Sequence, residues 1–303
     1  MKRWKTVIIV VIVIGAISFL LSGFFSDFNT VKIGNRIALI PLYGPITLDG
    51  NKGFFDFYGI STNNILDALK KAEEDPGIKG IVLEINSPGG TVVASEEIAN
   101  AVNKIKKPVV AWIREEGASG AYWIASSADY IIADPLSITG SIGVIGSYLE
   151  FADLLEKYGV KYQQLTSGEF KDTGSPFKKL SEKENELLQS KINKIHEFFI
   201  EEVSKNRNMS KTKISEIANG AFYLGIEAKE LGLVDELGGK EEAINKVKEL
   251  AGIKEASIVT YQKRSSIFDL FSNTIAYSSF YIGKGISYGL NEQVNRNNFE
   301  FRT

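Results

Sequence analysis

Ser119 is the residue of this sequence whose surroundings best suit covalent chemistry. It lies in the stretch "REEGASGAYWIAS", residues 114–126, between small residues at the predicted start of an apolar helix. A nucleophilic serine needs an exposed hydroxyl and a nearby N–H directed at the oxyanion that forms during attack. Gly120 could supply that N–H, and the small neighbours would let a substrate backbone approach. The alternative is that Ser119 is only a helix N-cap, which is a common role for serine.

A nucleophilic serine also needs a base. His196 is the only histidine, and the chain order Ser, Asp, His would suit an α/β-hydrolase triad. However, that class requires Gly-x-Ser-x-Gly, and the fifth position here is Ala121. His196 also lies in the middle of a predicted helix, so we expect a surface histidine. The remaining base is a lysine whose pKa falls by about three units from ~10.4, roughly 4 kcal/mol, which burial can provide.

A second glycine-bearing turn precedes another predicted helix in "LEINSPGGTVVASEE", residues 83–97. Pro88 fixes the turn, and Gly89 with Gly90 lets the backbone direct N–H groups outward at the helix start, where they could hold an anion. The alternative is a plain strand-to-helix turn. A phosphate-binding loop is disfavoured because no Gly-Lys-Ser or Gly-Lys-Thr follows.

These turns belong to an alternation of short strands and helices that predicts an α/β domain with parallel strands. Runs rich in Val, Ile and aromatic residues, bounded by Gly, Pro or Asp, predict strands within residues 36–46, 78–86, 107–113, 128–135 and 160–166. Apolar residues spaced three and four apart predict helices within residues 61–75, 91–107 and 181–206. The apolar stripe of the third helix consists of Leu188, Ile192, Ile195, Phe199 and Val203.

The composition excludes several classes of function. The net charge of −2 gives no basic surface for nucleic acid. The absence of cysteine excludes disulfides, thiolate catalysis and Cys-ligated metals. With a single histidine as well, we expect no metal and no cofactor.

The N-terminal residues predict a membrane anchor. Residues 6–25 carry no charge and are long enough as a helix to cross a hydrocarbon core of roughly 30 Å. Lys2, Arg3 and Lys5 favour a cytoplasmic N-terminus and place the rest of the chain on the outer face. The alternative is a cleaved signal peptide, although the segment is followed by no clean Ala-x-Ala site.

We therefore expect three parts: a cytoplasmic stub with the anchor (1–30), an extracytoplasmic domain (31–255) and a C-terminal extension (256–303). Within the extension, residues 266–290 are rich in aromatic residues and carry two charges, Asp269 and Lys284. This segment is expected to pack between subunits, or alternatively to lie on the membrane as an interfacial helix. Residues 291–303 are expected to be mobile.

Five stretches, "NSPGG", "GASGAYWIAS", "TGSIGV", "SGEFKDTGSPF" and "YLGIEAKELGLVDELGG", occur in this order between residues 86 and 239. Together they resemble the signal peptide peptidase A family of membrane-anchored serine peptidases, over most of residues 36–252. The resemblance implies a Clp-protease/crotonase-like α/β spiral of strand-strand-helix units, preceded by one transmembrane helix. It also implies a serine-lysine dyad.

By position, the resemblance assigns the nucleophile to Ser119 and the general base to Lys171. It assigns the oxyanion-binding N–H groups to Gly90 and Gly120, so that both glycine turns serve one site. Ser141 matches a serine that orients the lysine. The sequence departs from the family at Ala121, where a second glycine is commoner and where a methyl group could narrow the site.

The resemblance further implies that the substrates are extended peptides, namely signal peptides left in the cell membrane after cleavage, and that nucleic acid is not a partner. It implies a ring-like homo-oligomer, with an octamer as the candidate, in which Ser119 of one subunit meets Lys171 of the next. Two alternatives stay open: a stomatin-associated type of membrane Ser-Lys peptidase with another substrate, and a non-catalytic membrane-tethered interaction domain in which Ser119 is a cap.

Overall fold

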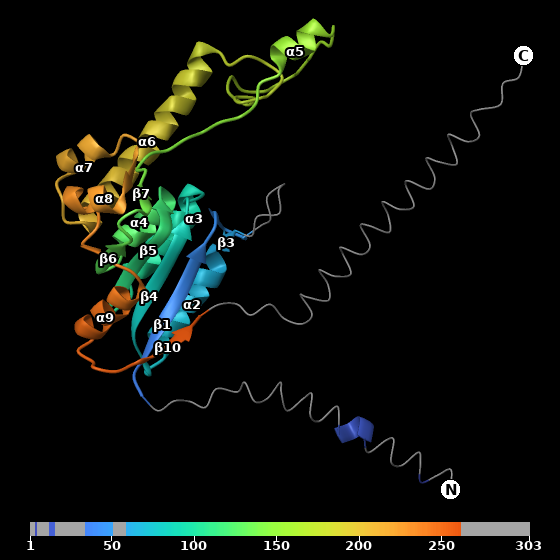
Figure 1. Ribbon diagram of the computed structural model, residues 1–303. Helices are drawn as coiled ribbons and strands as arrows, with labels where there is room; N and C mark the ends of the chain where they lie inside the picture. The colour runs from blue at the N-terminus through green and yellow to red at the C-terminus, as the bar shows by residue number, and fades with distance from the viewer. Residues whose placement is uncertain (1–3, 5–11, 16–33, 51–58, 262–303) are drawn as a thin grey trace, which may run out of the picture. The chain divides into compact units, whose positions relative to one another are not determined.

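The computed structural model describes residues 4, 12–15, 34–50 and 59–261 (Figure 1). The chain divides into two units, Met1–Thr260 and Tyr261–Thr303, and the elements below belong to the first. Within the described residues, no helix combines the length and apolar character needed to cross a membrane. The predicted anchor falls outside the described residues except for residues 12–15, and the predicted tail segments fall outside them entirely.

A parallel β-sheet forms the centre of the domain. Its main path runs in the order β10, β1, β4, β5, β6, β9, and every pair along it is parallel. The bounds of these strands, in chain order, are β1 (Arg36–Tyr43), β4 (Ile78–Ser87), β5 (Val109–Ala118), β6 (Tyr130–Ala133), β9 (Glu236–Leu237) and β10 (Ser257–Thr260). The central strands are almost continuously apolar because helices cover both faces of the sheet.

Short strands extend the sheet where the central ones end. β7 (Ile138–Gly140) pairs in parallel with the last residues of β5, and β8 (Phe222–Leu224) pairs antiparallel with β7. A separate parallel pair consists of β2 (Ile46–Thr47) and β3 (Ile60–Ser61).

Eight helices are described, with bounds α2 (Thr62–Glu74), α3 (Val92–Val102), α4 (Gly120–Ser126), α5 (Ala152–Lys157), α6 (Glu182–Asn206), α7 (Lys211–Ile217), α8 (Gly225–Leu231) and α9 (Lys240–Leu250). On one face of the sheet, Val82, Val110 and Trp112 pack with Ala243 and Val247 of α9. Because side chains alternate along a strand, Leu83, Ala111 and Ile113 point to the opposite face, where α2, α3 and α4 lie.

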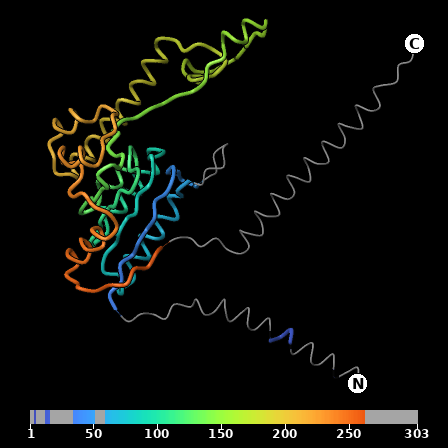
Figure 2. Tube along the Cα trace, in the orientation of Figure 1, coloured from blue at the N-terminus to red at the C-terminus, as the bar shows by residue number. Residues whose placement is uncertain are grey.

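The segment between β7 and the middle of α6 runs away from the sheet, and we call residues 147–188 the arm. Figure 2 shows the chain passing out through α5 and returning along α6. α6 begins with a capping box in which the Ser181 hydroxyl accepts from the Glu184 N–H and Glu184 accepts from the Ser181 N–H. Glu184 is the one buried residue of the arm, all of which the structure describes.

The predicted helices at 61–75, 91–107 and 181–206 are confirmed as α2, α3 and α6, and four of the five predicted strands are confirmed as β1, β4, β5 and β6. The fifth, residues 160–166, is wrong: the segment is irregular and lies in the arm. Its β-branched and aromatic residues do not pair with another strand there, and without pairing partners a short run gains no sheet stability.

Candidate active site

Ser119 occupies a strained turn between β5 and α4. Its backbone has φ 52° and ψ −124°, which L-residues rarely adopt. The N–H of Ser119 donates to the Gly140 carbonyl at 2.8 Å, and its carbonyl accepts from the Trp123 N–H at 3.0 Å. The side chain makes no capping bond, so the alternative of an ordinary N-cap is wrong. Among the described residues nothing hydrogen-bonds the hydroxyl, which leaves it free to react.

The two glycine turns meet beside Ser119. Gly120 is the first residue of α4, so its N–H has no acceptor within the helix. The Gly90 nitrogen lies 3.3 Å from where a Cβ on Gly120 would be. Neither N–H is used in a hydrogen bond by the described residues. Two free donors next to a free hydroxyl are the arrangement that stabilises the oxyanion of a tetrahedral intermediate.

Close packing favours glycine at both positions, against backbone at Gly90 and against a side chain at Gly120. A Cβ on Gly90 would lie 1.9 Å from the Ile46 carbonyl oxygen, and one on Gly120 would lie 2.2 Å from the Ser95 Oγ. β2 holds the first turn in place, because the Ile46 N–H donates to the Gly89 carbonyl and the Ile46 carbonyl accepts from the Thr91 N–H, both at 2.9 Å. Gly89 itself has φ +95°.

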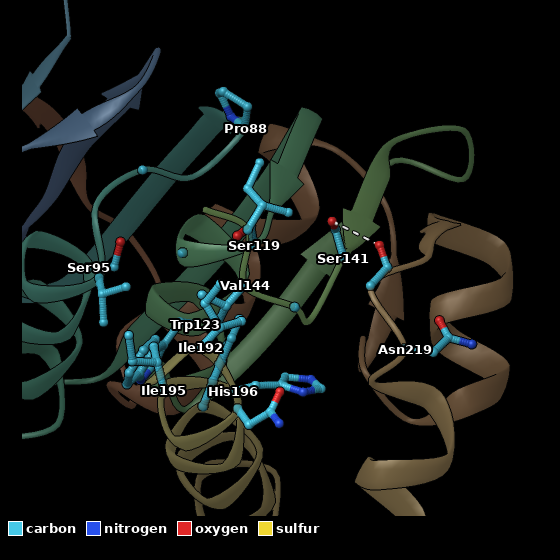
Figure 3. Close-up of a pocket in the computed structure, with 18 of the residues that line it drawn as sticks. Pro88, Ser95, Ser119, Trp123, Ser141, Val144, Ile192, Ile195, His196 and Asn219 are labelled. Atoms are coloured by element: carbon cyan, nitrogen blue, oxygen red, sulfur yellow. Dashed lines mark hydrogen bonds between the residues drawn. The ribbon is translucent and has the colours of Figure 1, made fainter. Parts of the chain in front are cut away.

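A cavity of about 550 Å³ opens at Ser119 (Figure 3). Gly90, Gly120 and Ser141 also line it. Its other walls combine apolar side chains with polar ones: Trp123, Val144, Ile192, Ile195 and Phe199 on the one hand, and Ser95, Gln189, Asn193, His196 and Asn219 on the other. The rings of Trp123 and Phe199 stack with centroids 4.8 Å apart, which fixes one wall. The apolar part of the lining suits a hydrophobic substrate side chain.

Ser141 lies at the end of β7 with an unusual positive φ of 49°. Its hydroxyl donates to the Gly220 carbonyl at 3.3 Å, and its N–H donates to the Ala221 carbonyl at 3.0 Å (Figure 3). Within one chain, therefore, Ser141 lines the cavity and contacts Gly220, and it makes no hydrogen bond to Lys171.

Lys171 is not among the residues that line the cavity. It lies exposed on the loop of the arm between α5 and α6. Its backbone N–H donates to the Gly168 carbonyl at 3.3 Å, and its ammonium forms no ion pair with any described residue. Four of the five predicted site residues therefore line one cavity within a single chain, and the fifth, Lys171, lies outside it on the arm.

The expectation that His196 is a surface histidine is wrong. The imidazole is half-buried and lines the cavity, and its Nε2 is buried without a hydrogen-bond partner among the described residues. In Figure 3 it lies at the far end of the cavity from Ser119, and no hydrogen bond joins the two. The sequence held a signal for this position: His196 follows Ile192 by four residues and precedes Phe199 by three, so it shares their helix face.

Ala121 does not narrow the site, contrary to the expectation. It is fully buried and does not line the cavity. Its methyl group packs in the core, because α4 is buried along its whole length. No cluster of potential metal ligands occurs among the residues that the structure describes.

The sequence matches peptidase family S49 over residues 101–254 and the Clp protease family over residues 59–133. A protein of Methanocaldococcus jannaschii named as a candidate protease is 35% identical, over 94% of this chain and 91% of its own length. An Enterococcus faecium protein named as a candidate signal peptide peptidase SppA is 36% identical, over 83% of this chain and 72% of its own. Protease 4 of Haemophilus influenzae is 37% identical over 75% of this chain, but over only 37% of its own length.

Proposed function

The chain belongs to peptidase family S49 and is a serine peptidase with a Clp-protease-like α/β fold, and we propose that it hydrolyses peptide bonds with Ser119 as nucleophile and Lys171 of a neighbouring subunit as general base. The observation that carries this proposal is the incomplete site of the single chain. Ser119 has a free hydroxyl and two free N–H donors but no base beside it, while Lys171 lies unpaired on the arm.

In the proposed reaction, the neutral Lys171 amine takes the proton of the Ser119 hydroxyl as Oγ attacks the substrate carbonyl carbon. The N–H groups of Gly90 and Gly120 stabilise the oxyanion. The resulting ammonium then gives its proton to the departing amine, which leaves an acyl-enzyme on Ser119. Water, deprotonated by the same amine, hydrolyses the ester and restores both residues.

For the substrate, we propose extended apolar peptides, and specifically residual signal peptides in the cell membrane. The apolar side chains in the cavity next to Ser119 support a hydrophobic substrate side chain. The name of the Enterococcus faecium relative supports the signal-peptide class. The uncharged run at residues 6–25 supports a membrane anchor with the catalytic domain on the outer face.

In the proposed closed ring, each subunit gives its arm to one neighbour and receives an arm from the other. The test is to co-assemble two inactive variants, Ser119→Ala and Lys171→Ala. A working site needs an intact Ser119 beside an intact Lys171 on the correct side. With equal and random mixing, about one quarter of the sites should recover activity.

Mixed assemblies that are confirmed by native mass spectrometry and yet inactive would contradict the shared site. His196→Ala serves as the control for a histidine base and should retain a rate near that of the wild type. Loss of activity in a folded, assembled His196→Ala enzyme would contradict the Ser-Lys dyad and favour a triad in which His196 is the base.

A further inference from the structure

The loop that carries Lys171 is fixed to α6 by a partly buried ion-pair network centred on Lys178. The Lys178 Nζ lies 2.6 Å from the Asp172 Oδ2 and 2.7 Å from the Glu184 Oε1. The side chains of Asp172 and Glu184 are only 12% and 4% exposed, although most of the arm is open to solvent. One lysine therefore pairs with two carboxylates, and one of them, Asp172, directly follows Lys171 in the sequence.

Two other carboxylates of the arm pair with lysines of their own. Glu169 pairs with Lys183 of α6 at 2.8 Å, and Asp153 of α5 pairs with Lys179 at 2.6 Å. Glu182 and Glu186, on the exposed surface of α6, form no ion pair with any described residue. Asp172 is also the carboxylate closest to Lys171 in the sequence, because it is the next residue.

Without Lys178, Glu184 would keep the hydrogen bonds from Ser181, whereas Asp172 would keep only one side-chain hydrogen bond. Glu184 accepts hydrogen bonds from the Ser181 N–H at 2.9 Å and the Ser181 hydroxyl at 2.8 Å. Asp172 has only Gln164 as a further side-chain partner. The hydrogen bond from Lys178 is also the main reason that the pKa of Asp172 lies below its usual value. Loss of Lys178 would thus leave a charged, poorly held carboxylate beside Lys171.

We propose that Lys178 is a positioning residue for the reaction: by binding the Asp172 carboxylate, it keeps that carboxylate from pairing with Lys171 and leaves the Lys171 amine able to act as a base. The proposal rests on the proposed function of Lys171. A lysine paired with a carboxylate holds its proton more tightly and is a poorer base at neutral pH.

The test is the pH profile of kcat in the assembled Lys178→Met enzyme. We expect the midpoint of the rising limb to move up by about 1 pH unit, because a nearby carboxylate shifts such a group by at least that amount. Below both midpoints, kcat should fall about tenfold, while KM changes little and activity recovers at high pH. Lys178→Arg, which keeps the charge, should retain the wild-type midpoint.

The double variant Lys178→Met/Asp172→Asn separates this role from a purely structural one. It lacks the carboxylate that would capture Lys171, so its midpoint should return to the wild-type position. If Lys178 only held the loop in place, the added Asp172→Asn change would not restore the wild-type midpoint. Lys183→Met/Glu169→Gln is the matched control, since it breaks another ion pair between the same loop and α6 without leaving a free carboxylate near Lys171, and its midpoint should be unchanged.

The direct readout is the pH dependence of acetylation of Lys171 by acetic anhydride, followed by mass spectrometry in a Ser119→Ala background. It applies even where the variants assemble poorly or are inactive. A wild-type midpoint in Lys178→Met, or a midpoint that stays shifted in the double variant, would overturn the proposal. If Lys171→Ala itself keeps activity, the proposed function of Lys171 is what fails.

Discussion

The backbone N–H of Ser119 donates a hydrogen bond to the carbonyl oxygen of Gly140, with 2.8 Å between nitrogen and oxygen. This bond joins the start of α4 to the end of β7, and the residues around it have positive φ values: 52° at Ser119, 73° at Gly140 and 49° at Ser141. Strain of this kind costs about 1–3 kcal/mol for each non-glycine residue. The fold therefore holds Ser119 in a conformation that exposes its hydroxyl.

A comparison of Ser119→Gly with Ser119→Ala should reveal this strain. Both variants should be inactive, because neither has a hydroxyl. Glycine adopts φ 52° without the clash that a Cβ causes, so Ser119→Gly should be more stable than Ser119→Ala by about 1 kcal/mol. Urea unfolding measures the difference. A glycine variant that is the less stable of the two would show that the turn is not strained.

Gly120→Ala should damage both activity and stability. The added methyl group would lie 2.2 Å from the Ser95 Oγ, and such overpacking costs about 1–3 kcal/mol. Because the displaced N–H is a proposed oxyanion donor, kcat should fall by about 10²-fold or more. Gly239→Ala is the control, since the nearest atom to its Cβ is the Glu242 Oε2 at 3.6 Å. Wild-type kcat in a folded Gly120→Ala enzyme would exclude this N–H from the mechanism.

The ion pair of Arg207 and Asp235 should be important for stability. Two hydrogen bonds of 2.6 and 3.0 Å join the side chains, and Arg207 is only 9% exposed. Asp235 also accepts from the Ile131 N–H at 2.7 Å. Arg207→Met leaves this carboxylate without its cation, so the free energy of unfolding should fall by about 3 kcal/mol.

The control for that measurement is Lys211→Met, which removes an exposed lysine that pairs with Glu197 and Glu201. Exposed pairs contribute about 0–1 kcal/mol. Equal losses of stability in the two variants would mean that burial does not strengthen the Arg207–Asp235 pair.

Acid should weaken the contribution of Glu184. The hydrogen bond from Lys178, followed by those from Ser181, lowers the pKa of Glu184 from 4.5 to about 2. Because the pKa is lower in the folded state, Glu184 stabilises the fold fully above pH 4.5 and loses this effect as the pH falls toward 2. The difference in free energy of unfolding between the wild type and Glu184→Gln should therefore shrink across this range. A constant difference would mean that ionisation of Glu184 is not linked to folding.

The sequence by itself determined the class of fold and most of its elements. A spacing of three and four residues between apolar positions predicted α2, α3 and α6, and runs rich in Val, Ile and aromatic residues predicted four central strands. Such a run was misleading at residues 160–166, because it forms a strand only where another strand pairs with it. The five glycine-containing stretches indicated the peptidase family, to which the chain belongs.

Only the tertiary structure decided how the site residues lie. Ser119, Gly90 and Gly120 meet because parallel strands deliver their carboxyl ends to one edge of the sheet, where β2 and β7 hold the turns. His196 enters the cavity wall because α6 packs against α4, a contact between segments far apart in the chain. Lys171 lies outside the cavity because the arm that carries it runs away from the sheet (Figure 2), and Lys178 ties its loop to α6. Such placements depend on packing between distant segments, which local residue patterns do not encode.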